Sequence, residues 1–339
     1  MLAGRPRRAA AAESPHRAGV ILARAMSVAF LMCVERGPLE SQAVLCVESL
    51  RRWGGGMSDS PVYAFAPRPG HEPAAETAAT LRGLGAVLVD EPLNARHAEH
   101  PTWNKVYASG WAERELEHDT LVFTDSDCAF LGEPAALAVG AWLAAAKPVG
   151  VSRAASSGTA DDEAEPWWGR LYANLRVEAE PYVTTVVDGR RVRAYWNAGL
   201  VAARRDAGLF GAWERALERL VEGGCVHPKP ELMDQMAWAG AVAAHHEQIW
   251  ELPDAYNYPL PQRARLKPPA AALDLDELVH VHLHRWAHAP GFLADLEPPL
   301  SPDSERRRWL DERLPLEPLL AESFGRVQAR RLRRAEAET

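Results

Sequence analysis

The N-terminal half of the chain alternates short apolar runs with longer amphipathic segments. The apolar runs are residues 27–34, 61–67, 86–90 and 120–124, and the helical patterns between them are residues 38–53, 74–83 and 103–117. A strand that is apolar throughout is buried on both faces, and strict alternation of strands with helices is typical of a parallel sheet. The sequence therefore predicts an α/β fold with a mostly parallel central sheet flanked by helices.

The C-terminal half is less regular and predicts a smaller antiparallel portion. Residues 183–201 have the pattern of a hairpin that turns at Asp188 and Gly189, and residues 278–286 begin as a strand. A polar loop of small residues at 152–170 ends in paired tryptophans, and such a long loop is usually functional or disordered. We expect it to close over substrate as a lid. Further helices are predicted at 206–222 and 231–243.

Three regions follow from these patterns. Residues 1–25 are rich in Arg and Ala without apolar periodicity, so we expect a disordered extension or a misplaced start codon, with Met26 as the natural beginning. Residues 26–300 form the predicted catalytic domain. Residues 301–339 are charged and helical in pattern, and we expect a C-terminal helical tail.

Composition narrows the classes of partner and compartment. A net charge of −8 is unsuited to a general nucleic-acid binder, which needs clustered positive charge. Four widely spaced cysteines are expected to be free thiols in a reducing compartment, and no apolar run is long enough for a membrane helix. The cytoplasm is the expected location. The basic residues 326–339 are a candidate for peripheral membrane contact.

Two carboxylates follow the fourth predicted strand. Asp125 and Asp127 flank Ser126 at the carboxyl edge of the sheet, where ligands of such folds bind. Paired carboxylates suit a Mg²⁺ or Mn²⁺ ion that keeps open positions for substrate phosphates. A surface turn is the alternative, but the apolar strand before the pair and Phe130 after it favour a site.

Three histidines alternate along the late strand. His280, His282 and His284 share one face, because successive side chains of a strand point to opposite sides. A single histidine on a strand is usually structural, whereas three on one face indicate metal or phosphate binding.

A further candidate segment contains Asn197 and Gly199. The Asn amide suits sugar hydroxyls and the Gly permits close backbone approach, although an Asn-x-Gly turn explains both equally well.

These motifs together resemble GT-A fold glycosyltransferases, and in layout family 8, which includes glycogenin and the lipopolysaccharide galactosyltransferases. LVFTDSDCAFLGEP resembles the metal-binding strand, and MCVERGPLESQAVLCVESLRRW resembles the first strand, nucleotide loop and helix. TWNKVYASGW, YWNAGLVAARRD, MDQMAWAG and LVHVHLHRW resemble four further family segments, in the same order along the chain. The resemblance covers about residues 27 to 288.

The resemblance implies roles for individual residues. Asp125, Asp127 and His280 are implied as metal ligands, with His282 as the close second to His280. Asp234 and Asn197 are implied at the catalytic centre. The residues implied in binding the nucleotide-sugar are Lys105, Asp125, Ser126, Asp127, Gly199, Gln235, His282 and Arg285.

Some of these residues have ordinary structural explanations. Asp234 suits a helix N-terminus and Lys105 suits a solvated helix face. Where family 8 has a Gly and a Lys-Pro-Trp after its histidine, this chain has His284, Arg285, Trp286 and His288. The phosphate partner therefore differs from that of the family.

The expected function is metal-dependent transfer of a sugar from a nucleotide-diphosphate sugar, with a UDP-sugar as donor, to an unidentified glycan, lipid or small-molecule acceptor. A sugar-phosphate nucleotidyltransferase is the second enzyme class, but it normally has a Gly-rich loop after the first strand, where this chain has only Gly37. A haloacid-dehalogenase-type phosphatase carries its Asp-x-Asp after the first strand, whereas three strands precede it here. A catalytically inactive nucleotide-sugar-binding protein is the non-enzyme alternative.

Overall fold

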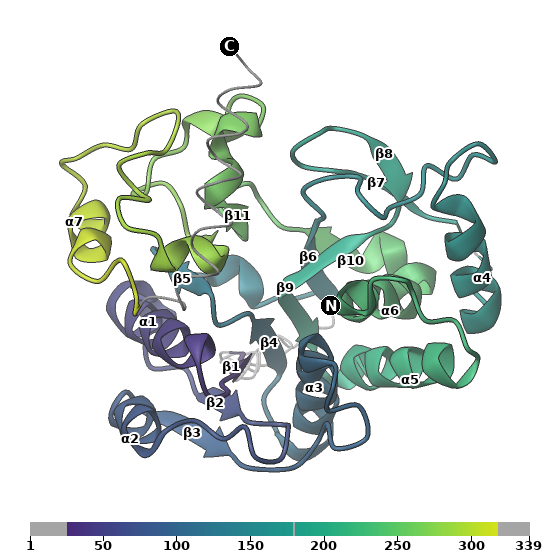
Figure 1. Cartoon of the computed structure of the whole chain (residues 1–339), viewed down its shortest axis with the longest axis horizontal. Coiled ribbons are helices and arrows are strands. Elements are labelled where there is room, and N and C mark those ends of the chain that lie inside the picture. The colour runs from purple at the N-terminus through teal and green to yellow at the C-terminus, as the bar shows by residue number, and fades with distance from the viewer. Residues whose placement is uncertain (1–25, 179, 318–339) are drawn as a thin grey trace, which may run out of the picture.

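The computed structural model describes residues 26–178 and 180–317, and a seven-stranded sheet forms its centre (Figure 1). The strand order is β10-β6-β9-β4-β1-β2-β3. Strand β9 is antiparallel to both of its neighbours, and the other pairings are parallel. The prediction of a mostly parallel central sheet is confirmed. The bounds are β1 (Val28–Cys33), β2 (Val62–Phe65), β3 (Ala86–Val89), β4 (Thr120–Thr124), β6 (Ala144–Pro148), β9 (Trp196–Arg204) and β10 (Ile249–Glu251).

Helices cover both faces of this sheet. In β1, Ala29 and Leu31 pack into one core cluster, while Phe30 and Met32 pack into the other. Successive side chains of a strand point to opposite faces, so a strand buried on both sides must be apolar throughout. The first cluster includes α3 (Asn104–Glu115), α4 (Glu165–Leu175), α5 (Leu209–Glu222) and α6 (Met233–Val242), and the second includes α1 (Pro38–Trp53) and α2 (Ala75–Gly83).

A second, smaller sheet lies beside α1 (Figure 1). It has the order β11-β12-β5, with β11 (Tyr258–Pro259) parallel to β12 (His280–His282) and β5 (Cys128–Phe130) antiparallel to β12. The third core cluster fills this region and includes α7 (Glu305–Asp311), whose Trp309 ring lies 6.5 Å from the Trp53 ring of α1. The part of the predicted tail that is described therefore packs against the domain, and residues 1–25 and 318–339 lie outside the described residues.

The predicted hairpin divides between two sheets. Strands β7 (Tyr182–Thr184) and β8 (Arg191–Arg193) pair around the expected turn, whereas the residues from Trp196 onward join the central sheet as β9. The late strand is also shorter than predicted. It ends at His282, and His284 has a φ of 53°, outside the β region, at the start of a short 3₁₀ segment, η9 (His284–His288).

The predicted lid is wrong. Helix α4 begins inside the expected loop, so that Trp167 is 6% exposed and Trp168 is fully buried. The Trp168 indole donates a hydrogen bond to the carbonyl of Ala154 over 2.9 Å. Trp168, Leu171 and Tyr172 lie on one buried face of the helix, and this spacing outweighs the polar composition of the preceding residues.

Across the described residues, no helix is both long and apolar enough to cross a membrane.

Candidate active site

The Asp-x-Asp motif lies at the carboxyl edge of the central sheet. Strand β1 pairs with β2 on one side and with β4 on the other. Strands β2 and β3 therefore extend the sheet on one side of β1, and β4 extends it on the other side. Ligands of such sheets bind beyond the strand ends at this switch point. Asp125 directly follows β4, and its backbone N–H donates to the carbonyl of Gly199 in β9 over 2.8 Å. The motif is therefore fixed to the two neighbouring strands.

The small sheet brings a histidine to Asp127. Strand β5 starts one residue after Asp127, and its partner β12 places His282 opposite Cys128. The ladder continues past the strand end, because the backbone N–H of Leu283 donates to the carbonyl of Asp127 over 2.9 Å. This pairing joins residues more than 150 positions apart, which periodicity along the sequence does not reveal.

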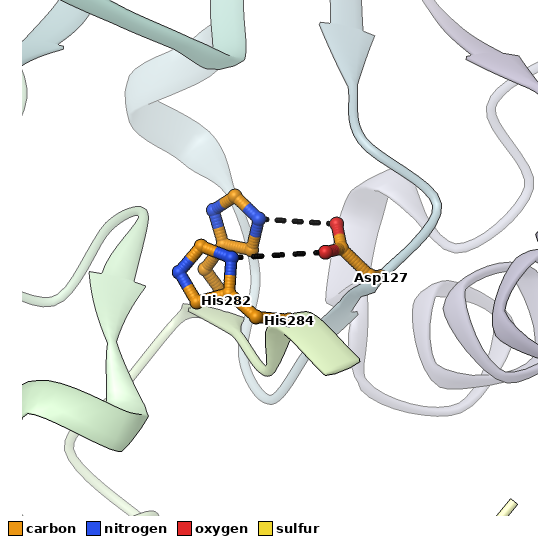
Figure 2. A group of neighbouring side chains, drawn as sticks. All are labelled: Asp127, His282 and His284. Atoms are coloured by element: carbon orange, nitrogen blue, oxygen red, sulfur yellow. Dashed lines mark ion pairs between the residues drawn. The ribbon is translucent and has the colours of Figure 1, made fainter. Parts of the chain in front are cut away.

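Two imidazoles face the Asp127 carboxylate (Figure 2). Nε2 of His282 lies 3.0 Å from Oδ1, and Nδ1 of His284 lies 3.7 Å from Oδ2. The two rings stack with centroids 3.7 Å apart. One ligand atom from each residue lies within 4.8 Å of the other two, so the three side chains can share one metal ion.

A chain of amides fixes the orientation of the His282 ring. The backbone N–H of Gly199 donates to Oδ1 of Asn197 over 2.8 Å, which identifies that atom as the carbonyl oxygen. Asn257 donates to the same oxygen through Nδ2 over 2.8 Å, so its own Oδ1 faces Nδ1 of His282 at 3.2 Å. Since a carbonyl oxygen only accepts, Nδ1 of His282 carries a proton and Nε2 is turned toward Asp127.

The charges of Asp127 and His282 depend on each other. Burial alone would raise the pKa of Asp127, but the imidazoles of His282 and His284 lower it well below its usual range. Burial alone would lower the pKa of His282, but the Asp127 carboxylate raises it above its usual value. A carboxylate oxygen and an unprotonated Nε2 at 3.0 Å would repel, so a proton or a cation must lie between them.

A lysine joins two further carboxylates beside this cluster. Nζ of Lys105, on α3, lies 2.7 Å from Asp125 and 3.2 Å from Asp234 at the start of α6. Burial alone would lower the pKa of Lys105, but the two carboxylates raise it, so the amine is charged. Burial raises the pKa of Asp234, and its Oδ1 has no hydrogen-bond partner among the described residues. Asp125 therefore faces Lys105, and the metal-type cluster contains Asp127 alone of the motif's two acids.

Gly199 lies where these groups meet. A Cβ at this position would lie 2.8 Å from Cε1 of His282, 2.9 Å from Oδ1 of Asn197 and 3.0 Å from Oδ2 of Asp125. Only a residue without a side chain fits this space. Gln235 lies nearby, where its Oε1 accepts from the backbone N–H of Ala198 over 3.3 Å.

His280, the expected ligand, is not part of this cluster, and His282, the expected second choice, is. His280 is fully buried opposite Phe130 in the β5–β12 ladder, and its Nε2 lies 3.0 Å from the hydroxyl of Thr124. Burial lowers the pKa of His280 to about 3, so the ring is neutral. Of the remaining predicted residues, Ser126 is buried within the motif, and Arg285 is exposed in η9.

Residues 30–246 match the family model described as the Rhodobacterales glycosyltransferase domain. The chain belongs to this family. The match includes Asp125, Asp127 and Asp234, whereas the histidines of β12 lie beyond it. It confirms the predicted glycosyltransferase class. No curated protein matches the sequence.

Solved structures similar to this glycosyltransferase domain are remote. The WbbM bifunctional glycosyltransferase has 12% identity and a TM-score of 0.48, covering 86% of this chain and 52% of its own. Mouse xyloside xylosyltransferase 1 has 10% identity and a TM-score of 0.46 over 76% of this chain and 97% of its own. The galactosyltransferase LgtC has 11% identity and a TM-score of 0.45 over 75% and 86%. The chain spans about half the length of WbbM, and the family assignment rests on the matched domain.

Proposed function

We propose that this glycosyltransferase uses a divalent metal, held by Asp127, His282 and His284, to transfer a sugar from a nucleotide-diphosphate sugar. The observation that carries the proposal is the 3.0 Å approach of His282 Nε2 to the Asp127 carboxylate, with the other ring nitrogen committed to Asn257. Two atoms 3.0 Å apart can both reach one metal ion at a ligand distance of about 2.1 Å, so a metal ion could take over the role of the proton.

The donor set favours Mn²⁺ over Mg²⁺. Two imidazole nitrogens and one carboxylate suit a transition metal, whereas Mg²⁺ prefers oxygen ligands and retains its waters. When bound, the metal would neutralise the negative charge that develops on a departing diphosphate. Lys105 adds a buried positive charge beside Asp125, on the same side of the sheet edge.

The transfer exchanges one bond for another at the anomeric carbon. The acceptor hydroxyl oxygen forms a bond to that carbon, and the bond between the carbon and the diphosphate oxygen breaks. The nucleoside diphosphate leaves with the electron pair, and the hydroxyl proton is released to it. Positioning and electrostatic stabilisation of the leaving group are the main contributions of such a site.

Asn197 and Asp234 are the proposed contacts to the reacting sugar. Oδ1 of Asn197 already accepts two hydrogen bonds, which leaves its amide N–H₂ to donate to a hydroxyl. Oδ1 of Asp234 is buried and has no hydrogen-bond partner among the described residues, and a buried unpaired carboxylate oxygen is costly unless a ligand or a small movement satisfies it. Both features support a sugar-binding role.

The test is donor hydrolysis with a panel of UDP- and GDP-sugars in the presence of MnCl₂ or MgCl₂. We expect nucleoside diphosphate release that depends on Mn²⁺ more strongly than on Mg²⁺. Asp127→Asn should abolish it, while Asp161→Asn, an exposed acid in the 152–170 segment, should not. Release of pyrophosphate from a nucleoside triphosphate would instead indicate a nucleotidyltransferase. Full turnover after removal of metal by EDTA would contradict the metal site.

A further inference from the structure

A pocket opens directly onto the candidate site. Its volume is about 340 Å³, within the range for small-molecule sites. Asn197, Gln235, His282 and His284 line it on the side of the site. Other lining residues come from the segment after β6 and from residues just before α6. A ligand in this pocket would therefore contact both the candidate site and these two segments.

Positive charge is concentrated in this pocket. Lys147, Arg153 and Lys229 line it, against one carboxylate, Glu231. The chain as a whole has a net charge of −8, so this excess of cations runs against the general charge of the protein. A local field of this sign raises the concentration of anionic ligands.

Two of these cations have no ion-pair partner among the described residues. Arg153 and Lys229 form no ion pair with any residue in the described part of the chain. Lys147 differs, because it is buried and donates to the carbonyls of Asp254 and Tyr256 over 3.0 Å each. Lys147 thus holds the segment that leads to Asn257, and Arg153 and Lys229 remain for a ligand.

The amides of Asn197, Gln235, Asn257 and Gln262 also line the pocket and suit sugar hydroxyls, so the cations are what would distinguish a charged sugar from a neutral one. Carbohydrate rings usually stack on exposed aromatic faces. Tyr195 is the Phe, Tyr or Trp side chain that lines this pocket and is 2% exposed, while Trp167 and Trp168 are buried on α4. Most other lining residues are apolar and strengthen electrostatic attraction by excluding water. They are Pro148, Val149, Val151, Val186, Leu232 and Pro259.

We propose that this pocket binds the acceptor and that the acceptor carries an anionic group, a carboxylate or a phosphate, recognised by Arg153 and Lys229. The inference rests on the proposed function. The donor diphosphate is an alternative anion, but it belongs at Asp127 and Lys105, whereas these two cations come from the β6–α4 connection and from the residue before η5 (Pro230–Leu232).

The experiment compares charged and neutral sugars on the full chain with MnCl₂ and UDP present. Glucuronate and glucose 6-phosphate are titrated against glucose by calorimetry. We expect both charged sugars to bind at least about tenfold more tightly than glucose, a difference of about 1.4 kcal/mol. That preference should shrink as the Debye length falls from about 30 Å to about 3 Å with added NaCl. Equal binding of all three sugars, or a preference that salt does not change, would overturn the inference.

A double variant assigns the effect to the two side chains. Arg153→Gln with Lys229→Gln should remove most of the preference for the charged sugars, and Arg82→Gln with Arg205→Gln, two exposed arginines outside the pocket, should keep it. An unchanged preference in the first variant would refute the assignment. If UDP competes with glucose 6-phosphate, and glucuronate binds no better than glucose, the two cations bind the donor phosphates and not the acceptor.

Donor hydrolysis by the unaltered chain separates the two levels of proposal. Mn²⁺-dependent release of nucleoside diphosphate without a preference for charged sugars leaves the proposed function standing and removes this inference. Absence of any UDP- or GDP-sugar hydrolysis or binding removes the proposed function itself.

Discussion

The side-chain oxygen of Asn257 lies 3.2 Å from Nδ1 of His282, the nitrogen that faces away from Asp127. Asn257 itself has a φ of 43°, a left-handed conformation that Asn tolerates better than most residues. The same amide donates to Asn197 over 2.8 Å, so one buried side chain connects Asn197, the proposed sugar contact, with His282, the proposed metal ligand. Such partners orient a ligand and raise its basicity.

Asn257→Gly should therefore weaken Mn²⁺ binding by roughly 10- to 100-fold. Gly accepts the left-handed backbone, so the loss reports the amide and not strain. Asn257→Asp keeps an acceptor for the Nδ1 proton and should retain more of the affinity than Asn257→Gly. Calorimetric titration with MnCl₂ measures both, and nitrogen NMR of the His282 ring reports the tautomer. Equal affinity in all three proteins would show that Asn257 does not position His282.

Gly199→Ala should inactivate the enzyme without unfolding it. The new Cβ would press on His282 and Asp125, both of which are held by other contacts. A displacement of about 1 Å at a reacting centre commonly costs on the order of 100-fold in rate. Gly83→Ala, at the end of α2 with open space around it, is the matched control. If the two variants have the same turnover number and the same melting temperature, the space around Gly199 is not needed for activity.

Lys147 gives the stability a recognisable pH dependence. Burial lowers its pKa to about 8 from the ordinary 10.5. Between these values the unfolded chain binds the proton more tightly than the folded chain, so the contribution of Lys147 to stability rises with pH through this window. In urea unfolding, the free energy of unfolding of the wild type should rise relative to that of Lys147→Met as pH increases from about 8. Lys267→Met, at an exposed lysine, corrects for loss of a lysine in general, and a constant difference would contradict the shift.

Trp168→Ala should destabilise the fold. The indole is fully buried and hydrogen-bonded to Ala154, and removal of a buried tryptophan typically costs about 3–5 kcal/mol. Trp142→Ala removes a side chain that is 41% exposed and should cost less. Chemical denaturation measures both. A stable Trp168→Ala protein with a selectively raised acceptor KM would restore the lid hypothesis.

The helices and strands that the sequence predicts correctly are those with a clear local hydrophobic pattern. The bounds of α1 and of β4 match the expected ranges residue for residue, because a buried strand and an amphipathic helix each show their own periodicity. The polar stretch before Trp167 and Trp168 predicts a loop, whereas the structure has a buried helix there. The helical spacing of Trp168 to Leu171 and Tyr172 was the available signal.

The positions of His282, the proposed ligand, and of Asn257 depend on contacts between distant segments of the chain. The β5–β12 register decides that His282 and not His280 meets Asp127, and one strand's alternation cannot distinguish two residues of the same face. Asn257 precedes a two-residue strand and has no pattern of its own. Its role follows only from contacts in three dimensions.

His280 and His282 provide the sharpest comparison, because they differ by one step along the same face of β12. His282→Ala removes a proposed ligand and should abolish Mn²⁺ binding and Mn²⁺-dependent donor hydrolysis. His280→Ala leaves a cavity beside Phe130 and Thr124 and should cost about 2–4 kcal/mol of stability. The folded fraction of that variant should still bind Mn²⁺, since His280 contributes no atom to the cluster around Asp127. Calorimetry at a temperature well below the midpoint of unfolding separates stability from binding. Loss of Mn²⁺ binding in folded His280→Ala, with binding retained in His282→Ala, would return the ligand role to His280 and require a different arrangement of β12 in the metal-bound enzyme.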